Sequence, residues 1–165
     1  MNAKQSGNII AKALEAQYTG SLNMLQAAIA AVPDERWHAG VGAWFYSYNV
    51  YHTIEAVQFY LGSDPDAMKW GARAGFEWSP DTNIEKDVLP KLNKKLVNSH
   101  MLEVRQKLSD ILKAMRDEEF FEVDGFYWVD SIFEKLVYCL RHTAHHVGEL
   151  CRALREWGLE PVKWS

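Results

Sequence analysis

RHTAHHVGELCRAL, residues 141–154, is the stretch of sequence from which the fold of this chain is predicted. It lies in a longer segment where apolar residues recur at steps of three and four, the spacing of one stripe along an α-helix. We therefore predict one long helix from about Asp130 or Ser131 to Trp157, with this stripe in the core. The stripe consists of Phe133, Val137, Leu140, Ala144, Val147, Cys151 and Leu154.

The same stretch holds three of the six histidines of the chain, at positions 142, 145 and 146. Residues four apart lie one turn above each other on a helix, with their side chains about 5–6 Å apart. The imidazoles of His142 and His146 can therefore converge on one point. At about 100° per residue, His145 falls among charged residues on the other side of the helix, so we predict that it points outward.

A third histidine, His52, occurs inside an otherwise apolar segment, WFYSYNVYHTIEAVQFYL, residues 44–61. Imidazole is the commonest ligand of zinc and related metals, and two protein ligands rarely suffice for a stable site. We therefore predict that His52, His142 and His146 form a metal site between two helices, with the catalytic residues unassigned. The alternative is that all three are ordinary histidines that have found hydrogen-bond partners.

The composition is that of a globular protein, with 48% apolar and 13% aromatic residues in a chain of 165. That length predicts a single domain over residues 1–165. The net charge is −4 and no basic cluster occurs, which argues against nucleic acid and against a membrane surface as partners. The N-terminus lacks an apolar signal core, and no run of about 18 apolar residues predicts a membrane span.

The two cysteines, Cys139 and Cys151, lie on the same predicted helix, twelve residues apart. That spacing separates them by about 18 Å along the helix axis, which is too far for a mutual disulfide. Free thiols in a chain without a signal segment fit a cytoplasmic protein. We interpret both residues as small buried side chains.

Three further helices follow from the same periodicity, and no convincing strand is predicted. The third begins between Lys91 and Ser99, with Ser99 as a candidate cap and His100 predicted to be exposed. Four helices with one long crossover loop between the second and third predict an all-α four-helix bundle. The predicted ranges of the first three helices are 8–31, 44–61 and about 91/99–117.

The second predicted helix is apolar almost all round, with Glu55 as its one charge, and a helix of that kind is buried on every side. Its outer face is predicted to meet either a second subunit, as in a homodimer, or the loop that follows. That loop, residues 62–90, carries Trp70, Phe76 and Trp78. It is interpreted either as a lid over the site or as a structural cover without contact to it.

Two acidic residues lie one helical turn from the candidate ligands, Glu55 from His52 and Glu149 from His146. Either can orient a ligand or move a proton, and either can be a solvated charge; for Glu149 we favour the solvated charge. Three aromatic residues are candidates for a pocket wall, although core or interface packing is the usual role of aromatics at such spacing. These are Trp44, Tyr48 and Trp128.

His52, together with the later segment HTAHHVGE at 142–149, resembles the DinB/YfiT-like superfamily of four-helix bundles. That family has a histidine in its second helix and a His-x-x-His-His-x-Gly-Gln/Glu segment in its fourth. The order of helices, the long crossover and the phrase Leu-Arg-x-x-Gly-Leu-x-Pro at 154–161 also match. The resemblance covers nearly the whole chain, although its specific part is short.

The resemblance implies a divalent ion (zinc, nickel or iron) held by His52, His142 and His146. Characterised members use the metal to activate a low-molecular-weight thiol, such as bacillithiol or mycothiol, and act as S-transferases or an isomerase. This chain departs from the family at Thr143, where Glu is frequent, and at Val147, where Arg is frequent. Neither departure removes a ligand, but both weaken any transfer of thiol-binding roles.

Two classes of function follow from the sequence. The first is a metal-dependent enzyme, an S-transferase or hydrolase, that joins a small thiol to an electrophilic small molecule. The second is a non-catalytic homodimer of the stress-response type, which binds metal incidentally or recruits a partner through its aromatic surface. A His-Glu-x-x-His protease is excluded because Thr143 stands where the general-base glutamate is required.

Overall fold

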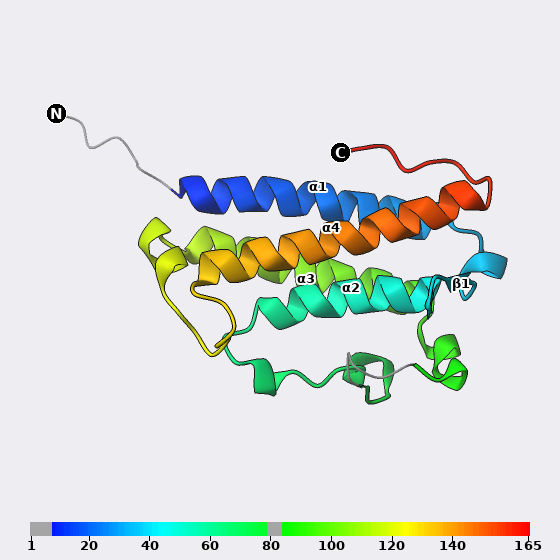
Figure 1. The fold of residues 1–165 in the computed structure, drawn as a ribbon, viewed down its shortest axis with the longest axis horizontal. Coiled ribbons are helices and arrows are strands. Elements are labelled where there is room, and N and C mark those ends of the chain that lie inside the picture. The colour runs from blue at the N-terminus through cyan, green and yellow to red at the C-terminus, as the bar shows by residue number, and fades with distance from the viewer. Residues whose placement is uncertain (1–7, 79–83) are drawn as a thin grey trace.

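The computed structural model describes residues 8–78 and 84–165, and this part of the chain is mostly helical. Four long helices run side by side (Figure 1), which confirms the predicted all-α class. They are α1 (Ile9–Ala31), α2 (Tyr46–Tyr60), α3 (Lys94–Ala114) and α4 (Ile132–Glu156). Short 3₁₀ helices occupy Asp34–Arg36, Pro65–Ala67, Ala72–Ala74, Lys86–Lys91 and Asp117–Phe121.

The core lies between these four helices, because α1 packs against α3 and α4, and α2 packs against the same two. Buried tyrosines tie distant segments together through backbone carbonyls. The hydroxyl of Tyr18 donates to Leu136 O at 2.7 Å, and that of Tyr46 donates to Ala28 O at 3.0 Å. Both hydroxyls are thus buried with a partner, as buried polar groups require.

Helix α4 begins and ends close to the predicted residues. Ser131 accepts a hydrogen bond from Glu134 N at 3.1 Å, and Gly158 adopts a φ of 72° beyond the last turn. The amides of Gly158 and Leu159 then bond to carbonyls of the last turn, a Schellman ending. The Glu134 side chain bonds the amide of Asp130 rather than that of Ser131, so only half of a capping box forms.

The apolar stripe predicted for α4 is correct from Val147 onward, whereas its earlier members Phe133, Val137 and Ala144 are exposed. Phe133 and Val137 are 37% and 42% exposed, whereas Leu136 and Cys139 are buried. The buried face is therefore rotated by about one residue near the beginning of the helix. Periodicity alone leaves such a rotation undetermined, since Phe133 and Leu136 both belong to apolar stripes.

The start of α3 also differs from the prediction. Asn93, not Ser99, caps the helix, and its side chain accepts a hydrogen bond from Leu96 N at 2.9 Å. His100 consequently lies in the second turn, where it is 1% exposed, so its predicted exposure is wrong. Its Nε2 lies 2.6 Å from Gln58 Oε1 on α2. Burial lowers the pKa of His100 to about 4, with Arg73 contributing and Glu103 opposing.

Two short strands precede α2, although none was predicted. β1 (Gly40–Val41) and β2 (Trp44–Phe45) pair antiparallel, with Val41 opposite Trp44. The two-residue turn between them places Gly42 at a φ of 60°, as tight hairpins require. Trp44 therefore belongs to a strand and not to the helix, and this hairpin determines where its indole lies.

Helix α2 is buried almost all round, as its sequence predicts: of its 15 residues only Gln58 and Phe59 are not fully buried. The segment that follows it runs along its outer side (Figure 1). Of the predicted 62–90 loop, residues 79–83 with Pro80 lie outside the described residues. The described part of the loop covers α2, and the predicted homodimer stays a prediction.

Several smaller predictions have mixed outcomes. Cys139 and Cys151 are buried free thiols, as expected. In the C-terminal tail, Val162 packs against the core and Ser165 Oγ donates to Gly20 O on α1 at 3.0 Å, so the tail folds back along α1, although Trp164 is 88% exposed. No helix formed by residues 8–78 or 84–165 combines the length and apolar character that a membrane crossing requires.

The buried His100 predicts a pH dependence of stability. Its pKa is about 4 in the folded chain and near 6.5 when exposed, so between these values the unfolded chain binds more protons. Stability should therefore fall as the pH falls from 6.5 to 4, by on the order of 3 kcal/mol from this residue. Urea unfolding of wild type and His100→Gln across this range isolates the effect, because only the wild type should show this part of the slope.

Candidate metal centre

The structure brings the side chains of His52, His142 and His146 together. The Nε2 atom of His142 lies 3.2 Å from that of His52 and 3.2 Å from that of His146. With metal–nitrogen bonds of about 2.0–2.1 Å, ligands of a tetrahedral ion lie about 3.3 Å apart. The three nitrogens are thus spaced as ligands of one ion, and the group is one that can hold a metal.

The packing of α2 against α4 produces this arrangement. His142 and His146 stand one turn apart on α4, with ring centroids 4.5 Å apart. His52 comes from the middle of α2, and its ring centroid is 5.0 Å from each of the other two. The sequence-based expectation that these three rings meet is therefore correct.

All three imidazoles are neutral near pH 7, because burial disfavours the charged ring. Burial, reinforced by His146 and His142, lowers the pKa of His52 to about 2. Burial together with His146 and His145 lowers that of His142 to about 4, against the attraction of Glu149. The pKa of His146 is lowered by burial even though Glu149 acts to raise it. Neutral rings carry the lone pairs that metal coordination requires.

A carboxylate fixes which nitrogen of His146 faces the cluster. Nδ1 of His146 donates to Glu149 Oε2 at 2.9 Å, which leaves the lone pair on Nε2. Asn49 Nδ2 donates to the same carboxylate oxygen at 3.1 Å. The interpretation of Glu149 as a solvated charge is therefore wrong, because the side chain is half-buried and bonded to a candidate ligand. This carboxylate–histidine pair is the usual support of a metal-binding imidazole.

Two buried nitrogens of the cluster remain without a partner in the described part of the chain, Nδ1 of His52 and Nδ1 of His142. When these nitrogens carry the ring protons, all three Nε2 lone pairs point toward each other and repel. A cation between them converts that repulsion into three bonds. The observed donor set, three neutral imidazole nitrogens, therefore fits a transition-metal ion.

Aromatic rings enclose the histidines. Trp44 stacks on His146, with centroids 5.4 Å apart and planes at 13°, and meets His52 edge-on at 4.9 Å. From the segment after α2, Trp70 and Trp78 lie 6.3 and 5.5 Å from the ring of His52. The segment thus contacts the site, so it is more than a structural cover. Trp70 and Trp78 belong to the wall, although neither was predicted to do so.

The other two predicted wall residues have different outcomes. Tyr48 adjoins the site, with its ring 6.2 Å from that of His52 and 5.0 Å from that of Trp44. Trp128 packs against Phe59 and Phe126 instead and is 44% exposed. It takes no part in the wall of the histidine cluster.

His145 points away from the cluster, as predicted, and its side chain is 66% exposed. With His146 and Glu149 it forms a second group of metal-ligating type. In that group Nδ1 of His146 already donates its proton to Glu149. The group also opens on a pocket of about 200 Å³ that Trp44 and Asn49 help to line. The buried three-histidine group is therefore the better candidate site.

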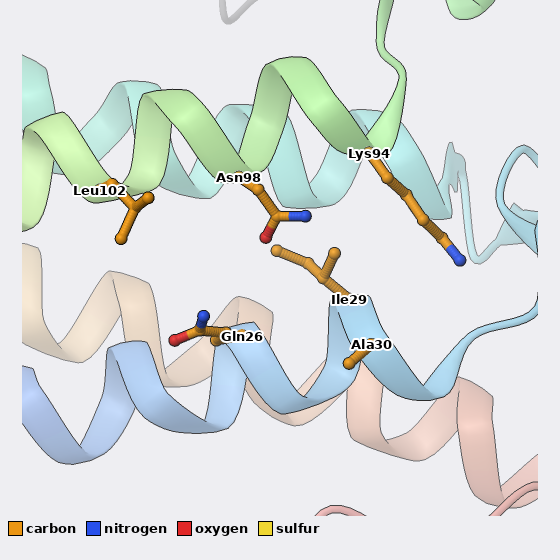
Figure 2. Close-up of a pocket in the computed structure, with 6 residues that line it drawn as sticks. All are labelled: Gln26, Ile29, Ala30, Lys94, Asn98 and Leu102. Atoms are coloured by element: carbon orange, nitrogen blue, oxygen red, sulfur yellow. The ribbon is translucent and has the colours of Figure 1, made fainter.

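A separate pocket lies between α1 and α3 (Figure 2) and is lined by Gln26, Ile29, Ala30, Lys94, Asn98 and Leu102. It contains none of the histidines. Its one charged residue, Lys94, bonds Val32 O and Asp34 at the edge of the pocket. We assign no role to it.

No protein-family model, curated protein or solved structure matches this chain. The site is therefore described by its own geometry. The DinB/YfiT-like resemblance stays a prediction that rests on the histidine motif.

Removal of the carboxylate behind His146 should weaken metal binding without removing a ligand. In Glu149→Ala the ring of His146 loses the acceptor for Nδ1–H, so we expect Zn²⁺ affinity to fall about 10- to 100-fold. Competition titration with a chromophoric chelator measures this. Glu156→Ala, which removes an exposed carboxylate of the same helix, is the control and should bind like the wild type. Equal affinities for both variants would contradict the role of Glu149.

Proposed function

We propose that this chain is a metal-binding protein in which His52, His142 and His146 hold one divalent ion, as in the four-helix bundles of the DinB/YfiT-like superfamily. The observation that carries the proposal is the pair of 3.2 Å distances between Nε2 atoms of buried, neutral imidazoles. The buried Nδ1 atoms of His52 and His142, which have no hydrogen-bond partner among the described residues, support it. Hydrogen bonding alone therefore does not account for the burial of the three rings together.

Three protein ligands leave at least one coordination position open, which is typical of catalytic rather than structural zinc sites. A bound ion would lower the pKa of a thiol or of water held at that position. Zinc, nickel and iron all accept imidazole ligands, so the donor set leaves the metal open. We therefore propose a metal-dependent S-transferase that acts with a low-molecular-weight thiol and an electrophilic small molecule.

The chain's own residues have distinct tasks in this proposal. Glu149 holds the ring of His146 in the tautomer that offers Nε2, and Asn49 holds Glu149. Trp44, Trp70 and Trp78 exclude water from the side of His52, which strengthens electrostatic interactions at the centre. Binding and orientation of the substrates would fall to residues around the open position.

Metal content tests the first part of the proposal. Untagged protein, purified without an immobilised-metal column, should contain about one ion per chain. His146→Ala should lose it, whereas His145→Ala should keep it, because His145 points outward. Saturation with metal at 100 times its Kd should stabilise the fold by about 2.7 kcal/mol, measured by urea unfolding with and without chelator. If the wild type is purified without metal, and neither Zn²⁺ nor chelator changes its free energy of unfolding, the non-catalytic alternative is favoured.

Thiol transfer tests the second part. With monochlorobimane as electrophile, the metal-loaded protein should accelerate conjugation of at least one thiol among bacillithiol, mycothiol, glutathione and cysteine. The metal-free form and His146→Ala should react at the uncatalysed rate, because the thiol then keeps its ordinary pKa. A metal-loaded protein that is inactive with every thiol would leave metal binding in place and remove the transferase proposal.

A further inference from the structure

A buried carboxylate on α2, that of Glu55, ties the segment after α2 to the helix. The residue is 1% exposed. Its Oε1 accepts a hydrogen bond from Gly71 N at 2.8 Å, and its Oε2 accepts one from Trp78 Nε1 at 2.9 Å. The earlier alternatives, a solvated charge or a group that acts on a ligand, do not describe these contacts. Both donors come from the same covering segment.

The backbone at Gly71 is closed tightly around this contact. Gly71 has a φ of 79°, and a Cβ there would lie 2.5 Å from Phe76 O and 2.8 Å from the Trp78 ring. The carbonyl of Gly71 accepts bonds from the amides of Ala74 and Phe76. The segment from Trp70 to Trp78 thus forms a compact loop that Glu55 holds at two points.

The two points of attachment are next to the two indoles that cover the metal ligand. Trp70 directly precedes Gly71, and Trp78 is itself one of the donors. The two indole rings lie 5.2 Å apart and pack against the ring of His52. Glu55 stands three residues after His52 on the same helix, so one carboxylate fixes the wall relative to the ligand.

No cation pairs with Glu55 among the described residues, so hydrogen bonds alone compensate for its burial. Burial raises the pKa of Glu55, and the bonds from Gly71 and Trp78 act to lower it. If the loop moved away, the carboxylate would lose its donors together and not one by one. The loop is therefore held in place cooperatively.

We propose that Glu55 is a positioning residue that fastens Trp70 and Trp78 over His52 and thereby sets how fast an ion enters and leaves the centre. This inference rests on the proposed function for its metal-exchange part. The fastening itself is a property of the chain with or without metal. Glu55 acts on the ligand through the two indoles, not by direct coordination.

The rate at which bound Co²⁺ is lost to excess EDTA tests the effect on exchange. The absorption of protein-bound Co²⁺, recorded in a stopped-flow instrument, measures this rate. Glu55→Gln keeps the volume but replaces one acceptor oxygen by an amide group, and Trp78→Phe keeps a ring but removes one donor. Each should raise the release rate at least tenfold. The double variant should release Co²⁺ at about the same rate as the single variants, because both changes break the same contact. Trp128→Phe is the matched control, because it removes an indole outside the wall, and it should release Co²⁺ at the wild-type rate.

Hydrogen exchange of the Gly71 amide in the metal-free chain tests the fastening independently of metal. Glu55→Gln should speed this exchange at least tenfold and leave the amides in the middle of α1 unchanged. Unchanged Gly71 exchange, or Co²⁺ release as slow in Glu55→Gln as in the wild type, would overturn the inference. A wild type that takes up no Co²⁺ would overturn the proposed function and the exchange role, while the Gly71 amide would still decide whether Glu55 fastens the loop.

Discussion

The contact between α2 and α4 is the constraint on which the rest of the site depends. The facing surfaces of these helices carry buried polar side chains where an ordinary core would have aliphatic ones. Thr53 and Thr143 satisfy their hydroxyls within their own helices, through Asn49 O and Cys139 O. Two polar contacts instead cross the helix pair: His52 on α2 meets His142 on α4, and Asn49 on α2 donates to Glu149 on α4. Buried polar groups are unfavourable unless they are paired, so such a concentration indicates a site rather than a means of stabilising the fold.

Three separate segments supply the surroundings of this contact. The β1–β2 hairpin places Trp44 on His146, the segment after α2 places Trp70 and Trp78 on His52, and Glu55 links that segment to α2. The aromatic wall explains why the histidines are neutral, since it removes the water that would stabilise a charged ring. The same wall covers the ring of His52, and the proposed control of metal exchange rests on how firmly it is held.

The apolar outer face of α2 was one reason to expect a homodimer, and the structure removes that reason. The chain covers this face with its own loop, and the loop donates hydrogen bonds to the buried carboxylate of Glu55. Four of the exposed large apolar residues lie in the connection between α3 and α4, namely Phe121, Val123, Tyr127 and Trp128.

The amino-acid sequence by itself determined the helices, the pairing of His142 with His146 and the identity of the third histidine. Helical periodicity and the cap residues Ser131 and Gly158 act within a few residues, so they can be read locally. The roles of Glu149 and His100, the β1–β2 hairpin and the wall residues Trp70 and Trp78 were decided only by the tertiary structure. Each depends on a neighbour distant in sequence, as Glu149 does on Asn49 and His100 on Gln58. Whether a carboxylate is solvated or orients a ligand follows from which segment packs over it, and local pattern carries no information about that.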